Sequence, residues 1–348
     1  MGTVVSIHVR PPSVDLPSAP SLDPAHSPDP APSLDHQGSQ PGRGAGELGT
    51  VGGTLPGLDV AIEAAVAALH RADEDFSTFK AGSWVSRLRR GEIGLADCPE
   101  HVREVYRLAD ACRERTDGWF DPAWRGDGTL DPTGLVKGWA ADVASAALCA
   151  AGFTDHCVNA AGDLRVRGTP APGRAWRTGI ADPFDRGRVV AVVEGTDLAV
   201  ATSGIAEQGA HVLDPRTGAP AAGLASVTVV GPDLALADAY ATAGLAAGRD
   251  ALDLLNDLAR AGWEWLTVDS AGRLDGSAGF RGQPPGLAGG AAPLGRVGPT
   301  HRARAVAPAA YFGYTQPVTV TTLPSVVPSV LPSGPPSALP PVADRPRP

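Results

Sequence analysis

The stretch Asp131-Pro132-Thr133-Gly134-Leu135-Val136-Lys137-Gly138-Trp139 joins a turn rich in Asp, Pro and Gly to an apolar helical pattern. Glycines let backbone N–H groups approach phosphate oxygens closely, and the N-terminus of a helix favours an anion. We expect a helix from about Gly138 to Ala151, and we interpret Gly134 to Gly138 as a cradle for a pyrophosphate. Taken alone, a D-P-x-x-G sequence is also typical of an ordinary turn.

Five other segments are rich in Gly, Asp, Ser and Thr, and each lies at a junction between expected helices or strands. They are Asp75 to Phe79, Gly118 to Pro122, Ala160 to Asp163, Ala201 to Gly204 and His211 to Gly218. Functional sites are usually built at such junctions. Each segment is a weak signal singly, so the order of all six along the chain carries the interpretation.

Asp238 and Thr242 lie four residues apart in a helical pattern, which places the carboxylate and the hydroxyl on one face. Hard oxygen ligands of this kind suit Mg²⁺, which takes few protein ligands and completes its octahedron with water and substrate phosphate. A second interpretation stays open, in which Asp238 caps the helix from Leu234 and Thr242 bonds back to a backbone carbonyl.

The order of expected elements is typical of an α+β domain with a mixed, largely antiparallel sheet and flanking helices. Residues 1–10 read as its first strand, 11–56 as a disordered insertion rich in Pro, Gly and Ser, 57–278 as the main domain and 279–348 as a disordered, Pro-rich tail. Within the tail, VTVTTLPSVVPSVLP alternates β-branched residues, and its prolines would confine any strand there to a sheet edge.

Composition excludes several classes of protein. The net charge of −9 and the isoelectric point of about 5.3 provide no basic field for nucleic acid. No window reaches about 18 uncharged apolar residues, which argues against a membrane span. Residues Met1 to Arg10 do not resemble a signal peptide, so we expect a cytoplasmic protein. Cys98, Cys112, Cys149 and Cys157 lack paired spacing and read as buried free thiols.

The six segments, in this order, resemble the FAD:protein FMN transferase family, also called the ApbE family, over nearly the whole ordered chain. The matching stretches include the opening Met1-Gly2-Thr3, Phe76 to Phe79, Trp119 to Pro122, Leu135 to Ala140, Val158 to Asp163, His211 to Gly218 and Ala237 to Thr242. The resemblance implies a single domain of the ApbE-like, T-fold-related kind.

The resemblance also implies a reaction. Bound FAD is split at its pyrophosphate, FMN passes to a Thr or Ser hydroxyl of a partner protein, and AMP leaves, with Mg²⁺ required. It places the metal on the Gly134 carbonyl, the Asp238 carboxylate and the Thr242 hydroxyl. FAD contacts are implied for Met1, Phe79, Trp119, Phe120, Asp121 and Asp131, with Lys137 and His211 nearby. Lys137 would neutralise phosphate charge, and Asp238 or His211 would be the base.

Two departures and several alternatives bear on this expectation. Ala161 stands where the family commonly has glycine, and Phe79 where it commonly has tyrosine. Phe120 is read equally well as a core aromatic, and His211 as a structural histidine. The nearest alternative function is an FAD pyrophosphatase that delivers FMN to water. A flavin-binding protein without turnover is another.

Overall fold

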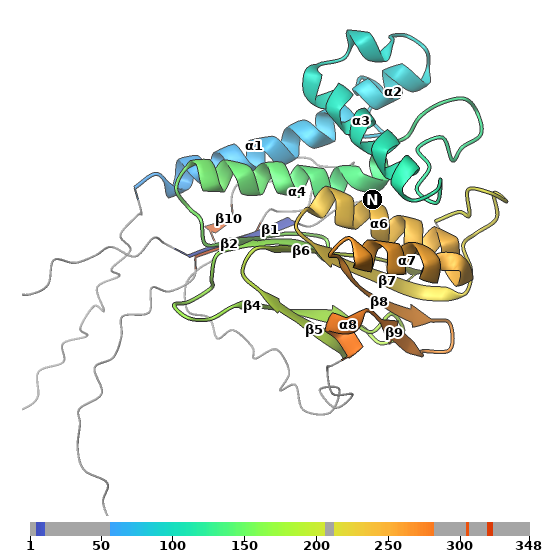
Figure 1. Cartoon of the computed structure of the whole chain (residues 1–348). Helices are drawn as coiled ribbons and strands as arrows, with labels where there is room; N and C mark the ends of the chain where they lie inside the picture. Colours follow the sequence, from blue (N-terminus) through green and yellow to red (C-terminus); the bar gives the residue numbers. More distant parts are fainter. Residues whose placement is uncertain (1–4, 11–55, 206–211, 282–303, 306–318, 323–348) are drawn as a thin grey trace, which may run out of the picture.

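The computed structural model describes residues 5–10, 56–205, 212–281, 304–305 and 319–322. Met1 and His211 lie outside these ranges, as do nearly all of the expected insertion at 11–56 and most of the expected tail at 279–348. The described residues form a helical layer, a central sheet and a small hairpin layer (Figure 1). The expected α+β architecture is confirmed.

The central sheet has the strand order β10-β11-β1-β2-β3-β6-β7-β8-β9 within the described residues. Neighbouring strands are antiparallel except β1 and β11, which are parallel. The strands are β1 (Val5–Val9), β2 (His156–Ala160), β3 (Asp163–Arg167), β6 (Leu198–Gly204), β7 (Leu224–Gly231), β8 (Glu264–Asp269), β9 (Leu274–Gly276), β10 (Arg304–Ala305) and β11 (Thr319–Thr322).

Helices cover one face of this sheet (Figure 1). They are α1 (Leu58–Phe76), α4 (Thr133–Ala150), α6 (Leu234–Ala247) and α7 (Ala251–Arg260), while α2 (Trp84–Arg89) and α3 (Glu100–Arg115) lie at one end of the layer. Alternation along the strands explains the packing, since Val227 and Val229 of β7 join the helical core and Val230 faces away. The hairpin of β4 (Trp176–Ala181) and β5 (Val189–Gly195) covers that other face.

Helix α6 is the centre of the core, because almost all its residues are buried. Its small side chains, many of them alanine, let it lie close to both the sheet and α4. Asp233 caps its N-terminus by accepting a hydrogen bond from the Leu236 N–H at 2.8 Å. Asp142 of α4 accepts two more, from the N–H groups of Leu234 and Ala235. The start of α6 is therefore fixed against α4.

Two expected helix starts are wrong. Helix α4 begins at Thr133 rather than near Gly138, because Asp131 accepts hydrogen bonds from both the N–H and the hydroxyl of Thr133 and so starts the helix early. In the sequence, Asp97 with Pro99 shortly after it favours a helix that opens at Asp97. Helix α3 begins instead at Glu100, since Asp97 ends a separate 3₁₀ turn and its carboxylate accepts from the Gly94 N–H.

The tail contributes to the sheet. Residues Thr319–Thr322, from the VTVTT stretch, form β11 beside β1, which confirms that this stretch can add a strand. The expectation that prolines would confine the strand to an edge is wrong, because β11 lies between β1 and β10. Pro317 and Pro324 both fall outside the four paired residues.

Two smaller expectations concern cysteines and membranes. Cys98, Cys112 and Cys157 are buried free thiols as predicted, whereas Cys149 is only half-buried. Among the described residues, no helix combines the length and the apolarity that crossing a bilayer requires.

Candidate functional site

The site is organised by the crossing of α4 over the start of α6 (Figure 1). A Cβ at Gly138 would lie 2.4 Å from the Leu234 carbonyl oxygen and 2.9 Å from the Ala235 Cα, so only glycine fits there. This close approach brings the Gly138 N–H within 3.1 Å of Oδ2 of Asp238. The carboxylate predicted as a metal ligand is thus held against the predicted phosphate cradle.

Asp238 does not cap its own helix, so the alternative interpretation of this residue is wrong. The cap is Asp233, and Asp238 lies in the second turn, only 5% exposed. Burial, with the nearby Asp163 carboxylate adding to it, raises the pKa of Asp238 to about 7, although Lys137 acts in the opposite direction. A buried carboxyl with such a pKa is a group that a cation would stabilise in its charged form.

Lys137 connects two carboxylates. Its Nζ lies 2.7 Å from Oδ2 of Asp163 and 3.8 Å from Oδ1 of Asp238. The two carboxylates therefore balance the positive charge of Lys137, which lies near the N-terminal end of α4, where the helix dipole disfavours a cation. The Lys137 side chain as a whole is 33% exposed.

The hairpin turn between β2 and β3 positions Asp163. Ala161 and Gly162 both have positive φ, 52° and 97°, as a two-residue type I′ turn requires. Asn159 supports the turn by accepting a hydrogen bond from the Gly162 N–H at 2.8 Å. Asp163 then begins β3, and its Oδ1 accepts from the Thr202 N–H of β6 at 3.0 Å. Its other oxygen is left for Lys137.

Thr242 and Gly134 approach each other from α6 and α4. A Cβ at Gly134 would lie 3.8 Å from Cγ2 of Thr242 and 2.9 Å from Cε2 of Phe120. The Thr242 hydroxyl lies 3.1 Å from the hydroxyl of Ser203 on β6. The three predicted metal ligands, Gly134, Asp238 and Thr242, therefore come from two packed helices whose crossing is fixed by Gly138.

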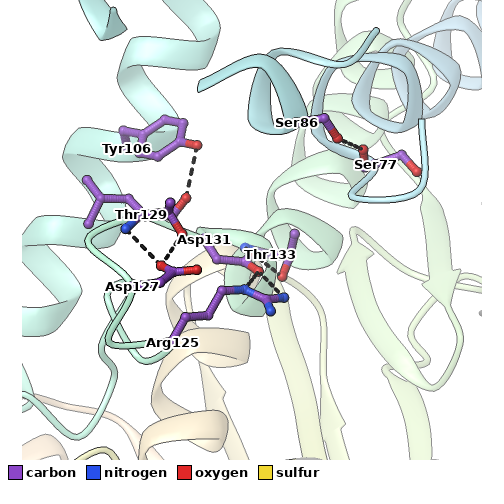
Figure 2. A network of polar contacts seen from close by, with 9 residues as sticks. Ser77, Ser86, Tyr106, Arg125, Asp127, Thr129, Asp131 and Thr133 are labelled. Atoms are coloured by element: carbon purple, nitrogen blue, oxygen red, sulfur yellow. Dashed lines mark hydrogen bonds and ion pairs between the residues drawn. The ribbon is translucent and has the colours of Figure 1, made fainter. Parts of the chain in front are cut away.

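A polar network continues from the start of α4 (Figure 2). Asp131 is buried, and its Oδ2 accepts from Nε and Nη2 of Arg125 at 3.2 and 3.1 Å. Its Oδ1 accepts from Thr133. Beside it, the Tyr106 hydroxyl donates to the carbonyl of Leu130 at 3.4 Å. Asp131 therefore holds the Arg125 loop and the start of α4 together.

The predicted aromatic contacts are largely covered. Trp119 is 8% exposed, and the guanidinium carbon of Arg216 lies 3.8 Å from its ring centroid. Phe120 is buried against Gly134. Asp121 pairs with Arg113 at 3.2 Å. The rings of Trp119 and Phe120 therefore pack inside the turn before α4 and are not open for stacking on a ligand.

Phe79 lies in a second turn, after α1. The carbonyl of Ser77 accepts a hydrogen bond from the Ser83 hydroxyl at 2.7 Å. It accepts a second from the Ser86 hydroxyl at 3.4 Å (Figure 2). The Phe79 side chain itself is exposed. The turn is therefore fixed while its aromatic ring is accessible.

Comparison with known families decides the relationship. The sequence profile of the ApbE family matches residues 1–126 and 124–263, which is well over half of the chain. The chain belongs to the ApbE family. Its matches span the α4 start, the Asp163 turn and the Asp238 helix described above.

Two curated ApbE relatives carry the name FAD:protein FMN transferase. The one from Rhodobacter capsulatus is 41% identical over 129 residues, which is 35% of this chain and 24% of that protein. The one from Vibrio cholerae is 32% identical over 131 residues, covering 35% of this chain and 39% of that protein. The matched part of the chain thus spans about a quarter to two-fifths of these relatives' length.

Solved ApbE structures share the fold more completely. The ApbE protein from Thermotoga maritima aligns with a TM-score of 0.59 and 26% identity, covering 64% of this chain and 90% of that one. The Vibrio cholerae flavin transferase ApbE aligns at 0.56 and 21%, covering 66% and 92%. The second likeness supports the ApbE fold alone.

Of the predicted ApbE site residues, the structure gathers Gly134, Lys137, Asp238 and Thr242 at the α4–α6 crossing. Met1 and His211 lie outside the described residues. Asp163 and Ser203 were not selected individually, although both fall in segments singled out by composition. The sequence alone does not predict that Asp163 pairs with Lys137 or that Ser203 pairs with Thr242, because the two residues of each pair lie on different elements that are distant in the sequence.

Proposed function

We propose that this protein is a Mg²⁺-dependent transferase that moves FMN from FAD onto a Thr or Ser hydroxyl of a partner protein and releases AMP. The observation that supports it most directly is the meeting of Asp238 with the Gly134–Gly138 segment, through the hydrogen bond from the Gly138 N–H. Membership of the ApbE family supports the same reaction.

The residues present fit a magnesium ion. Gly134 would offer its carbonyl, Asp238 its carboxylate and Thr242 its hydroxyl, an all-oxygen set that Mg²⁺ prefers. When bound, the ion would neutralise pyrophosphate charge.

The chain's own residues would bind and orient FAD. The N-terminus of α4, which begins at Thr133, would favour the pyrophosphate anion. The Lys137 ammonium, which pairs with Asp163, would also attract the phosphates. Phe79, Asp121 and Asp131 are proposed to line the dinucleotide, with Trp119 and Phe120 supporting the turn beneath it. Met1 and His211 remain proposed contacts.

Asp238 is the proposed base among the described residues, and His211 is the other candidate. A carboxylate is one of the groups that general-base catalysis uses, and burial raises the pKa of Asp238 above its ordinary value in the metal-free protein. In the proposed reaction Asp238 would accept the proton of the acceptor hydroxyl as that oxygen attacks the phosphorus on the FMN side of FAD. The bond from this phosphorus to the bridging oxygen would break, and AMP would leave with the bridging oxygen on its phosphate.

The catalytic unit is proposed to be residues 57–278 together with the first strand from 1–10. An acidic chain makes nucleic acid an improbable partner on electrostatic grounds, so the proposed partner is the acceptor protein. The expected cytoplasmic location stays a prediction.

The test is intact-mass analysis of a candidate acceptor after incubation with the protein, FAD and Mg²⁺. An EDTA arm and the Glu63→Gln variant, on the exposed face of α1, serve as controls. A metal-dependent gain of one FMN is expected. If free FMN and AMP form without an adduct on any Thr- or Ser-bearing acceptor, the protein is instead a pyrophosphatase. If FAD stays intact, the protein is a flavin-binding protein without turnover.

A further inference from the structure

The loop between Pro122 and Asp131 carries an aromatic side chain that the proposed function has not used. The loop closes on itself, because the Asp131 N–H donates to the Pro122 carbonyl at 2.7 Å. Near its start, the Trp124 N–H donates to the Asp121 carbonyl at 3.1 Å. Trp124 is therefore held in a tight turn at the start of the loop that leads into α4.

Arg125 fixes one face of the Trp124 ring. Its guanidinium carbon lies 4.2 Å from the ring centroid, within the range of a cation–π contact. The same guanidinium donates from Nε and Nη2 to Oδ2 of buried Asp131, which in turn holds Thr133 at the first turn of α4 (Figure 2). Three successive contacts thus join the indole to the helix that carries Gly134 and Lys137.

Exposure separates Trp124 from the neighbouring aromatics. Trp119 and Phe120 are nearly buried, and Arg216 covers a face of Trp119. Trp124 is 38% exposed. An aromatic ring that is both held in place and accessible can stack on a ligand at little cost in conformational entropy. Such a ring can stack on any planar base, because every base has a π-face.

We infer that Trp124, backed by Arg125, stacks on a planar ring at one end of bound FAD. This inference rests on the proposed function, since it assigns a further specificity residue to the same site. Asp131 acts through Arg125 as a positioning residue. The Gly-rich start of α4 holds the pyrophosphate, and the Trp124 ring sets the direction in which one end of the dinucleotide leaves it.

The test measures the Kd for FAD of the full-length protein by equilibrium dialysis with Mg²⁺ and no acceptor, within the time in which no AMP forms. Trp124→Ala is expected to weaken binding between about fivefold and about a hundredfold, the range that loss of one stacked ring gives. Trp124→Phe should restore most of the affinity. Phe184→Ala, which removes an exposed aromatic ring beyond β4, is the matched control and should bind FAD normally.

Competition identifies the ring. If the Trp124→Ala change weakens binding of AMP but not of riboflavin, the stacked ring is adenine, and the opposite pattern makes it isoalloxazine. Unchanged FAD affinity in Trp124→Ala, with FMN transfer intact in the wild type, would overturn the inference and leave the proposed function standing. Failure of the wild type to bind FAD would overturn both.

Discussion

The backbone N–H of Gly138 on α4 donates a 3.1 Å hydrogen bond to the Asp238 carboxylate on α6. The contact exists because Gly138 has no Cβ and lies against the backbone at Leu234 and Ala235. A side chain on one helix is thereby oriented by the main chain of another. The geometry of the proposed metal site therefore depends on how closely two helices cross.

Gly138→Ala should destabilise the protein. Alanine normally stabilises a helix relative to glycine by about 1 kcal/mol. Here its methyl group would meet backbone atoms, and such overpacking costs about 1–3 kcal/mol. Urea unfolding measures the change. Ala146→Gly, at an exposed position of α4, is the control and should lose only the helix-propensity difference. A stabilised Gly138→Ala variant would contradict the tight crossing.

Asp238→Asn should abolish Mg²⁺-dependent transfer without unfolding the protein. The amide oxygen can still accept from the Gly138 N–H, and a buried negative charge is removed. In EDTA, the melting temperature is expected to equal or exceed that of the wild type. Added Mg²⁺ should raise the melting temperature of the wild type only. An equal Mg²⁺ shift in both proteins would exclude Asp238 as a ligand.

In the metal-free protein, the Asp238 carboxyl should contribute a loss of stability as the pH rises from about 4 to about 7. The folded state keeps the Asp238 proton to a pKa of about 7, whereas the unfolded chain releases it near the ordinary value of about 3.9. In that window the folded state binds more protons, so the free energy of unfolding decreases with pH.

Asp142 contributes with the same sign, because burial raises its pKa to about 6. His8, His70 and His156 contribute with the opposite sign, because burial lowers the pKa of each imidazole. Urea unfolding in EDTA at pH 5 and pH 8 measures the combined slope. Asp238→Asn should remove the Asp238 contribution, so the stability of the variant should fall less between pH 5 and pH 8, or rise more, than that of the wild type. Identical slopes in the two proteins would show that Asp238 does not titrate in this range.

Ala161→Gly should stabilise the protein by about 0.5–1 kcal/mol, because a left-handed backbone conformation costs a non-glycine residue about 1–2 kcal/mol and glycine adds unfolded-state entropy. Thermal unfolding provides the measurement, and Ala147→Gly on helical backbone should destabilise by about the usual helix penalty. Destabilisation of Ala161→Gly would mean that the methyl group makes a contact outweighing the strain.

A chain ending at residue 322 should be as stable as the full chain, and one ending at 318 should be less stable. The shorter chain lacks β11 and leaves the backbone groups along one edge of β1 unpaired within the sheet. Differential scanning calorimetry compares the two truncations. Equal melting temperatures would show that β11 adds nothing to the fold.

Local patterns predicted much of this structure. The apolar spacing of Leu58 and Ile62 is typical of one face of a helix, and these residues lie in α1. The β-branched run Ser226 to Val230 is typical of a strand, and it lies in β7. The early start of α4 was missed because Pro132 and Gly134 are typical of a turn, and only the Asp131 contacts to Thr133 outweigh that preference. The six residues of α2 were too few for a periodic pattern.

Within the site, residue types were predictable and their pairings were not. The spacing of Asp238 and Thr242 placed both on one helix face, as the structure has them. The link from Lys137 to Asp163, and that from Thr242 to Ser203, join residues on different elements. Only tertiary packing specifies such pairs, since no local pattern in one sequence encodes which distant side chains will meet.

The parallel pairing of β1 with β11 also affects the order in which the sheet can form during synthesis. During synthesis β1 emerges from the ribosome long before residues 319–322, which complete its second edge and come after every other described part of the fold. Pairings that close so long a loop form slowly, and an unprotected strand edge invites aggregation during that interval. Yield in a cell-free translation system should therefore be sensitive to the C-terminal tail, although the tail holds none of the proposed catalytic residues.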